Sequence, residues 1–196
     1  AGLASLAPVH GRVNLAATAA GLFTAPPGMV AAVNAVDEAL TLATLPSGTR
    51  VAAGAIVSTI KTINYAVAGS ALTTAIAAAR PLMVAAFRPL SITLIATTLP
   101  GTNAKALAKL ERVTAARITT LGSRMEMLPP CPHETVALAA RLAGCSADLV
   151  LVAGASATVD RGDVIPQAIV AAGGTVERLG MPVDPGNLLV LGTLAG

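Results

Sequence analysis

The second half of the chain alternates short apolar runs with segments of helical periodicity. The runs that predict strands are 91–96, 124–128, 148–153, 175–179 and 188–191. The segments that predict helices are 102–121, 132–142 and the stretch that follows Asp163. Such alternation is typical of a parallel or mostly parallel sheet covered by helices on both faces. We therefore expect a three-layer α/β fold in this half of the chain.

The longest predicted helix, Thr102 to Leu121, carries a clear apolar stripe. Its members stand at spacings of three and four residues: Leu107, Leu110, Thr114, Ile118 and Leu121. This spacing places them on one face of a helix. Gly122 is a suitable stop signal. The Thr97 to Gly101 segment before the helix is expected to be a loop beyond the end of the 91–96 strand.

The first 90 residues give a mixed pattern. Two helices are expected at 14–22 and 29–39, separated by the breaker Pro26-Pro27-Gly28. Strands are then expected at 40–45, 49–52 and 56–63, followed by a helix from Ser70 to about Ala79. We expect an α+β region of unknown role over 1–89, a boundary near Arg88-Pro89, and an α/β domain over 90–196.

Composition limits what the protein binds. The chain has two Phe, one Tyr and no Trp among 196 residues, so Ala, Val, Leu and Ile must form the core. Recognition of single-stranded nucleic acid usually stacks bases on aromatic side chains. The net charge of +3 is mild, and the basic residues are scattered. We expect no nucleic-acid partner, whereas a small anionic ligand is compatible with this composition.

The mean hydropathy of +0.73 resembles that of a membrane protein. The two long uncharged stretches, 13–36 and 62–79, are nevertheless interrupted by Asn, Pro, Gly, Ser or Thr. A spanning helix needs about 20 predominantly apolar residues. We expect no membrane segment and a cytoplasmic location. The start lacks the charged region of a signal peptide and an initiating Met, which is compatible with a piece of a longer protein.

Metal-ligating residues are few. Cys131 and Cys145 do not form a Cys-x-x-Cys pair, and the chain has only two His, so no zinc or other metal site is expected. The run from Cys131 to Glu134 could be interpreted as metal-binding. We favour an ordinary first helical turn with Pro132 at its first position and an acid near its N-terminus.

One strand-to-helix connection suggests an anion-binding loop. The apolar run 148–153 opens into the small residues Gly154-Ala155-Ser156, and a helix begins soon after, at Asp163. Small residues let backbone N–H groups approach a ligand, and the first turn of a helix offers further free N–H groups to an anion. The alternative is a purely structural turn.

Three motifs together resemble the molybdopterin-binding domain family, whose members include the Mog, MoeA and gephyrin type proteins of molybdenum cofactor biosynthesis. Gly154-Ala155-Ser156 stands where that family has a glycine-rich loop, Asp163-Val-Ile-Pro166 where it has a helix start, and Pro185-Gly186-Asn187 where it has a Pro-Gly turn before the last strand. The resemblance spans about residues 90 to 196. It implies the three-layer fold of that family and a molybdopterin or molybdenum cofactor ligand.

The resemblance also implies a ligand site at the carboxyl edge of the sheet. The expected binding residues are Thr97, Thr98, Gly154, Ala155, Ser156, Ala157, Thr158, Asp163, Pro185, Gly186 and Asn187. Asp163 is the candidate catalytic residue, because a carboxylate there could orient magnesium. Its structural alternative is the N-cap of the following helix, and the two roles are compatible.

Departures from the family pattern favour binding over turnover. Thr98, Ala108 and Asn187 stand where the family commonly has two acids and a lysine. We expect a protein that binds molybdopterin during cofactor maturation or delivery, associates with copies of itself, and has a molybdoenzyme or a cofactor-biosynthesis protein as a partner. The alternatives are a molybdopterin adenylyltransferase or molybdate-insertion enzyme that uses Mg²⁺ and ATP, and a nucleotide-processing protein of the competence-damage-inducible type.

Overall fold

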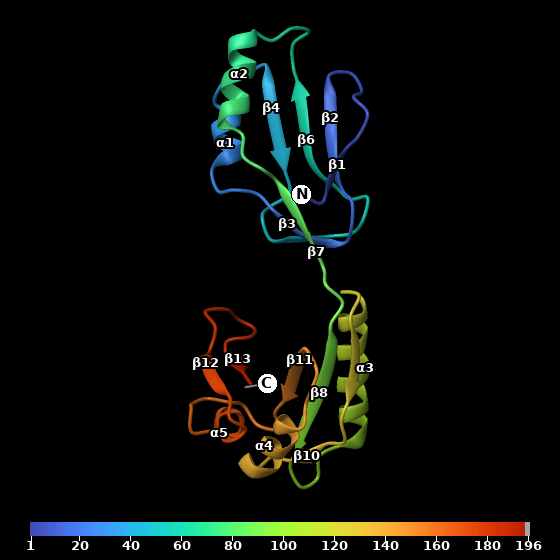
Figure 1. Cartoon of the computed structure of the whole chain (residues 1–196), viewed down its shortest axis with the longest axis vertical. Coiled ribbons are helices and arrows are strands. Elements are labelled where there is room, and N and C mark those ends of the chain that lie inside the picture. Colours follow the sequence, from blue (N-terminus) through green and yellow to red (C-terminus); the bar gives the residue numbers. More distant parts are fainter. Residues whose placement is uncertain (195–196) are drawn as a thin grey trace. The chain divides into compact units, whose positions relative to one another are not determined.

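The computed structural model describes residues 1–194, and the chain forms two compact units, Ala1–Phe87 and Arg88–Gly196 (Figure 1). Both units combine helices with sheets, so the protein is a mixed α/β structure with several sheets. Parallel strand pairing occurs in the second unit. No helix within residues 1–194 is long and apolar enough to cross a membrane.

The first unit contains two antiparallel sheets and two helices. One sheet has the order β1-β2-β6-β4 and the other β5-β3-β7. The strands are β1 (Leu3–Ser5), β2 (Arg12–Ala17), β3 (Gly21–Thr24), β4 (Leu40–Thr44), β5 (Thr49–Val51), β6 (Ile56–Thr62) and β7 (Met83–Ala86). Helix α1 (Met29–Asn34) packs against β4 and against α2 (Gly69–Ala78). The strands expected at 40–63 and the helix expected after Ser70 are therefore confirmed.

The helix expected at 14–22 is wrong. The segment forms β2 and the start of β3 instead, and β2 pairs with β1 on one side and with β6 on the other. Alanine-rich sequence favours a helix locally, but pairing on both edges and burial of Ala16 and Ala17 override that preference.

The helix expected at 29–39 is shorter than predicted, because Asn34 bonds to a strand. Its side-chain amide donates to the Leu42 carbonyl at 2.9 Å, and its oxygen accepts from the Leu42 N–H at 2.7 Å. This pair of bonds attaches the last residue of α1 to β4. Asp37 then accepts from the Ala39 N–H at 2.8 Å, which sets the turn into the strand.

The second unit has a parallel sheet in which β8 (Ser91–Thr98) is central. Strand β9 (Arg124–Met127) pairs with one edge of β8, β11 (Leu149–Ala153) pairs with the other, and β10 (Cys131–Pro132) pairs with the last two residues of β8. Residues 92–97 of β8 are all buried. A strand covered on both faces is expected to be mostly apolar, and Ile92, Leu94, Ile95 and Ala96 fit this, with Thr93 and Thr97 as buried polar residues.

Three helices accompany this sheet. Helix α3 (Ala104–Thr119) packs against β9, while α4 (Thr135–Ala143) and α5 (Val164–Ala171) pack against each other. Leu138 and Leu142 of α4, Ala168 of α5 and Ile95 of β8 share one buried core. The helices expected at 102–121 and after Asp163 are thus confirmed, with ends shifted by a residue or two.

The start of α4 differs from the prediction. Cys131 and Pro132 form β10 rather than a helical turn, and the His133 N–H donates to the Thr98 carbonyl at 2.9 Å. Thr97 and Thr98, expected in a loop, extend β8. The physical reason is the same for both: β10 pairs with these two residues and so prolongs the strand.

The last two strands form a separate antiparallel hairpin. Strand β12 (Thr175–Leu179) pairs with β13 (Val190–Thr193), which begins two residues later than the predicted strand. Within the described residues the hairpin pairs with no strand of the parallel sheet. The outer edge of β11 is therefore without a strand partner in this part of the chain.

The first prediction concerns the core of the first unit. The Phe23 side chain is fully buried between the two sheets, whereas the neighbouring Leu22 is 40% exposed on the same strand. Phe23→Ala should lower the stability of the first unit by about 3–5 kcal/mol, and Leu22→Ala by less than about 1 kcal/mol. A urea titration, monitored through the NMR signals of each unit, measures the free energy of unfolding of the first unit. Equal losses for the two variants would contradict the assigned core.

Candidate anion-binding site

The Thr97 hydroxyl joins three segments at the carboxyl end of β8. Its oxygen lies 2.8 Å from the Ala155 amide nitrogen and 2.8 Å from Nδ1 of His133. Thr97 is 3% exposed, so these bonds lie within the protein. They connect β8 to the loop that follows β11 and to the segment that leads into α4.

The tautomer of neutral His133 decides whether Thr97 or the ring donates in the hydrogen bond that they share. The Ala155 N–H can only donate, so the Thr97 oxygen accepts that bond and the hydroxyl has one proton left to give. The His133 Nδ1 lies at 2.8 Å and the Ala153 carbonyl at 3.5 Å. If the ring hydrogen sits on Nε2, the Thr97 hydroxyl donates to Nδ1; if it sits on Nδ1, that N–H donates to the Thr97 oxygen and the hydroxyl donates to the Ala153 carbonyl.

Thr98 holds β10 in place. Its hydroxyl donates to the Cys131 carbonyl at 3.2 Å, next to the backbone bond from His133 to the Thr98 carbonyl. The Cys131 side chain is buried, and this burial raises the pKa of its thiol. A protonated, buried thiol packs as an apolar group. Thr98 and Cys131 thus fix the backbone from which His133 projects.

Gly154 permits the sharp turn after β11. A Cβ atom at this position would lie 2.8 Å from Cδ1 of Ile165 and 2.9 Å from the Ser156 carbonyl oxygen. The second contact is with backbone, which cannot move aside as a side chain can. The small residue noticed in the sequence is therefore required by the close approach of the chain to itself.

Asp163 closes the loop that precedes α5. Its Oδ2 accepts from the Val159 N–H at 2.6 Å and from the Asp160 N–H at 3.1 Å. These two bonds lower the pKa of the carboxyl group, and the nearby His133 contributes to the same shift. The side chain makes no bond to the first turn of the helix. The N-cap role expected for this carboxylate is therefore replaced by a loop-closing role.

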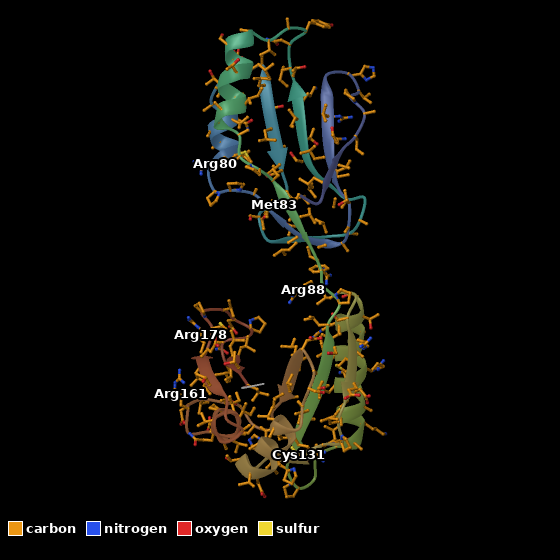
Figure 2. All side chains as sticks on the ribbon, viewed as in Figure 1. Arg80, Met83, Arg88, Cys131, Arg161 and Arg178 are labelled. Carbon is orange, nitrogen blue, oxygen red and sulfur yellow. The ribbon has the colours of Figure 1, made fainter. Side chains whose placement is uncertain are left out.

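Other bonds complete the same loop. The Asp160 carboxylate accepts from the Gly162 N–H at 2.5 Å, and the Gln167 side chain donates to the Arg161 carbonyl at 2.8 Å. The Arg161 guanidinium donates to the Val176 carbonyl of β12 at 3.1 Å, and Figure 2 shows Arg161 beside that strand. Several loop N–H groups are thus already satisfied by carboxylates of the protein.

Three consecutive N–H groups of this loop, those of Ser156, Ala157 and Thr158, are among those left over. Within residues 1–194 they donate to no protein acceptor. Ser156 and Ala157 are exposed, whereas the Thr158 side chain is buried. Consecutive unpaired N–H groups are the usual means by which a loop binds an anion. We name residues 156–158 the amide loop.

A cleft of about 680 Å³ extends from the amide loop along β11. One wall is formed by Leu149 to Val152 and the other by Leu188 to Leu194, with Ile165 and Ile169 of α5 between them. The amide loop and Gly154 line the same cleft. A volume of about 300–1,000 Å³ is typical of sites for small molecules and cofactors.

Some of the binding residues predicted from the sequence line the cleft, and others bond to the protein elsewhere. Gly154 and the amide loop line the cleft, whereas Thr97 and the Ala155 N–H are bonded to each other and offer no free donor there. Thr98 bonds to β10 and Asp163 to its own loop. Pro185, Gly186 and Asn187 lie in the hairpin turn, where the Asn187 carbonyl accepts from Met181 at 3.0 Å.

His133 is the residue that the sequence interpretation missed. The run from Cys131 to Glu134 predicts a helical turn, and this interpretation gives His133 no role at the site. The pairing of β10 with β8 brings it to Thr97, from which it is separated by 36 residues in the sequence. Within residues 1–194 no group of three or more His, Cys, Asp or Glu side chains could hold a metal ion.

The second prediction concerns Asp163. Because the pKa of its carboxyl group is lowered in the folded protein, the charged form stabilises the loop above the ordinary carboxyl pKa, and this contribution is lost as the pH falls through the folded pKa. Asp163→Asn should therefore speed hydrogen exchange at Val159 and Asp160 at neutral pH. The difference from wild type should shrink in acid. Unchanged protection at neutral pH would contradict the loop-closing role.

Comparison with known proteins gives no family assignment. A scan against protein-family models finds no match to this chain, and a search of curated proteins finds none.

Proposed function

We propose that the second unit binds molybdopterin or the mature molybdenum cofactor, and that it handles this ligand during cofactor maturation or delivery to a molybdoenzyme. The observation that carries the proposal is the cleft of about 680 Å³ that begins at three unpaired N–H groups of residues 156–158. The motif order that resembles the molybdopterin-binding family adds to it. Under this proposal residues 90–196 form the three-layer domain of that family.

The ligand and the cleft are chemically compatible. Molybdopterin has a terminal phosphate, a dithiolene and a pterin whose edge carries hydrogen-bond donors and acceptors. The phosphate would bind the amide loop, where the Ser156 hydroxyl is a further donor. The pterin would lie along β11, whose outer edge offers backbone N–H and C=O groups without a strand partner in the described residues. Apolar walls such as Leu149 and Ile169 would cover its faces.

Charge placement favours binding over catalysis. The two carboxylates of the loop, Asp160 and Asp163, accept bonds from loop N–H groups. Thr98, which stands where the family commonly has an acid, donates to the Cys131 carbonyl. Phosphate chemistry with magnesium relies on carboxylates that are free to bind the metal. This supports a binding or handling role over adenylyl transfer or molybdate insertion.

The third prediction tests the amide loop with a matched pair. Ala157→Asp places a negative charge among the three unpaired N–H groups, whereas Ala157→Asn has nearly the same shape without the charge. Isothermal titration with molybdopterin should show binding weakened at least about tenfold by Asp, because like charges repel at close range. Asn should change the affinity by less than about threefold. Both variants should retain the wild-type amide spectrum outside the loop.

Equal affinities for the two Ala157 variants would contradict the amide loop as the phosphate site. The same samples separate binding from turnover when Mg²⁺ and ATP are added in single-turnover experiments. The binding proposal predicts bound molybdopterin and no adenylylated product. Rapid product formation by wild type, lost in Asp163→Asn while binding persists, would instead establish an adenylyltransferase.

A further inference from the structure

His133 is held at one ring nitrogen and free at the other. Nδ1 lies 2.8 Å from the Thr97 hydroxyl oxygen, and the His133 backbone N–H donates to the Thr98 carbonyl at 2.9 Å. Within residues 1–194 Nε2 has no hydrogen-bond partner. An imidazole oriented through Nδ1 by a buried partner presents Nε2 in a defined direction.

The ring is next to Gly154, which lines the cleft, although His133 itself is not among the lining residues. Cε1, the carbon between the two nitrogens, lies 3.9 Å from where a Cβ of Gly154 would stand. His133 is also close enough to Asp163 to contribute to the lowered pKa of that carboxyl group. The side chain is half-buried, so part of the ring reaches solvent. The Gly154 distance places the ring beside the start of the loop formed by residues 154–163.

We propose that His133 is a ligand-binding residue, and that its Nε2–H donates to a phosphate monoester held by the N–H groups of residues 156–158. The inference rests on the proposed function in so far as the amide loop is the phosphate site. The proposal requires the Nε2–H tautomer of neutral His133, in which the Thr97 hydroxyl donates to Nδ1, and the protonated ring has a hydrogen on Nε2 as well. The donor to the phosphate is therefore present in both charge states.

The Thr97 hydroxyl bonds both to His133 and to the segment that leads into the amide loop. It orients the imidazole through Nδ1 and holds the Ala155 N–H, one residue before the amide loop. A structural role alone would require only the Nδ1 contact. A ligand role requires the opposite nitrogen as well, so the two roles can be separated by substitution.

The test uses two variants that each resemble half of the imidazole. His133→Asn places a polar atom near the position of Nδ1 and nothing at that of Nε2, whereas His133→Gln reaches the position of Nε2. Methyl phosphate is titrated while NMR follows the Ser156, Ala157 and Thr158 amides. We expect about tenfold weaker binding for Asn, the loss of one charge-assisted hydrogen bond, and a smaller loss for Gln. Equal affinity of His133→Asn and wild type would overturn the proposal.

Ring nitrogen spectra provide an independent measurement. The chain has two His, so the signals lost in His133→Asn identify His133 and those that remain belong to His10. We expect the Nε2–H tautomer at alkaline pH and a shift of the Nε2 signal when methyl phosphate is added. An Nδ1–H tautomer, or a ring that does not respond while the loop amides do, would overturn the proposal.

The outcome distinguishes this inference from the proposed function. If methyl phosphate perturbs His133 and the amide loop but molybdopterin does not bind, the inference holds and the proposed ligand is wrong. If molybdopterin binds wild type and His133→Asn equally well, the proposed function holds and the inference is wrong. If Asn weakens binding and also exposes the Ala155 amide to exchange, His133 acts through the loop structure and the direct contact is wrong.

Discussion

The buried hydroxyl of Thr97 is the interaction on which the candidate site of the second unit depends. One oxygen atom holds the Ala155 N–H and one ring nitrogen of His133, each at 2.8 Å. A hydroxyl is suited to this position because it accepts and donates at the same time. Without it, the Ala155 N–H would lose its protein partner, and such a hydrogen bond contributes about 0.5–1.5 kcal/mol net. The loop that begins the cleft and the segment that leads into α4 therefore share one anchor.

The parallel sheet explains why this anchor lies where it does. Strand β8 is central, with β9 and β10 on one edge and β11 on the other. Because all of these pairings are parallel, the carboxyl ends of the strands meet at one edge of the sheet, where ligands usually bind in such folds. Thr97 is next to the last residue of β8, and its side chain can reach the segments that leave both neighbouring strands.

The sequence alone predicts most of the second unit and less of the first. Strands β8 and β11 are apolar runs, and α3 has an apolar stripe with regular spacing, so local pattern and final structure agree. Segment 14–22 fails because its alanines favour a helix, whereas β1 and β6 pair with it as a strand. Such pairing depends on residues far away in the sequence and has no local signal.

The candidate site also combines features that have a local sequence signal with features that depend on distant residues. Small residues at 154–158 mark a loop that allows close approach, and this feature is visible in the sequence. The sequence does not show which partners bind in this loop. Thr97 bonds to Ala155, 58 residues away in the sequence, and to His133, 36 residues away. The structural alternative for the Asp163 carboxylate is a cap of the next helix, yet its side chain bonds to the preceding loop. Local motifs thus indicate where a site begins, and strand pairing decides which groups remain free.

Hydrogen exchange at the Ala155 amide in Thr97→Val shows whether the Thr97 hydroxyl anchors the loop. Valine has the shape of threonine without the hydroxyl, and Thr93→Val, at a buried position of the same strand, is the control. We predict that Thr97→Val strongly reduces protection at Ala155, changes the ring signals of His133 and weakens methyl phosphate binding, while the control leaves all three unchanged. Full protection of Ala155 in Thr97→Val would contradict the account.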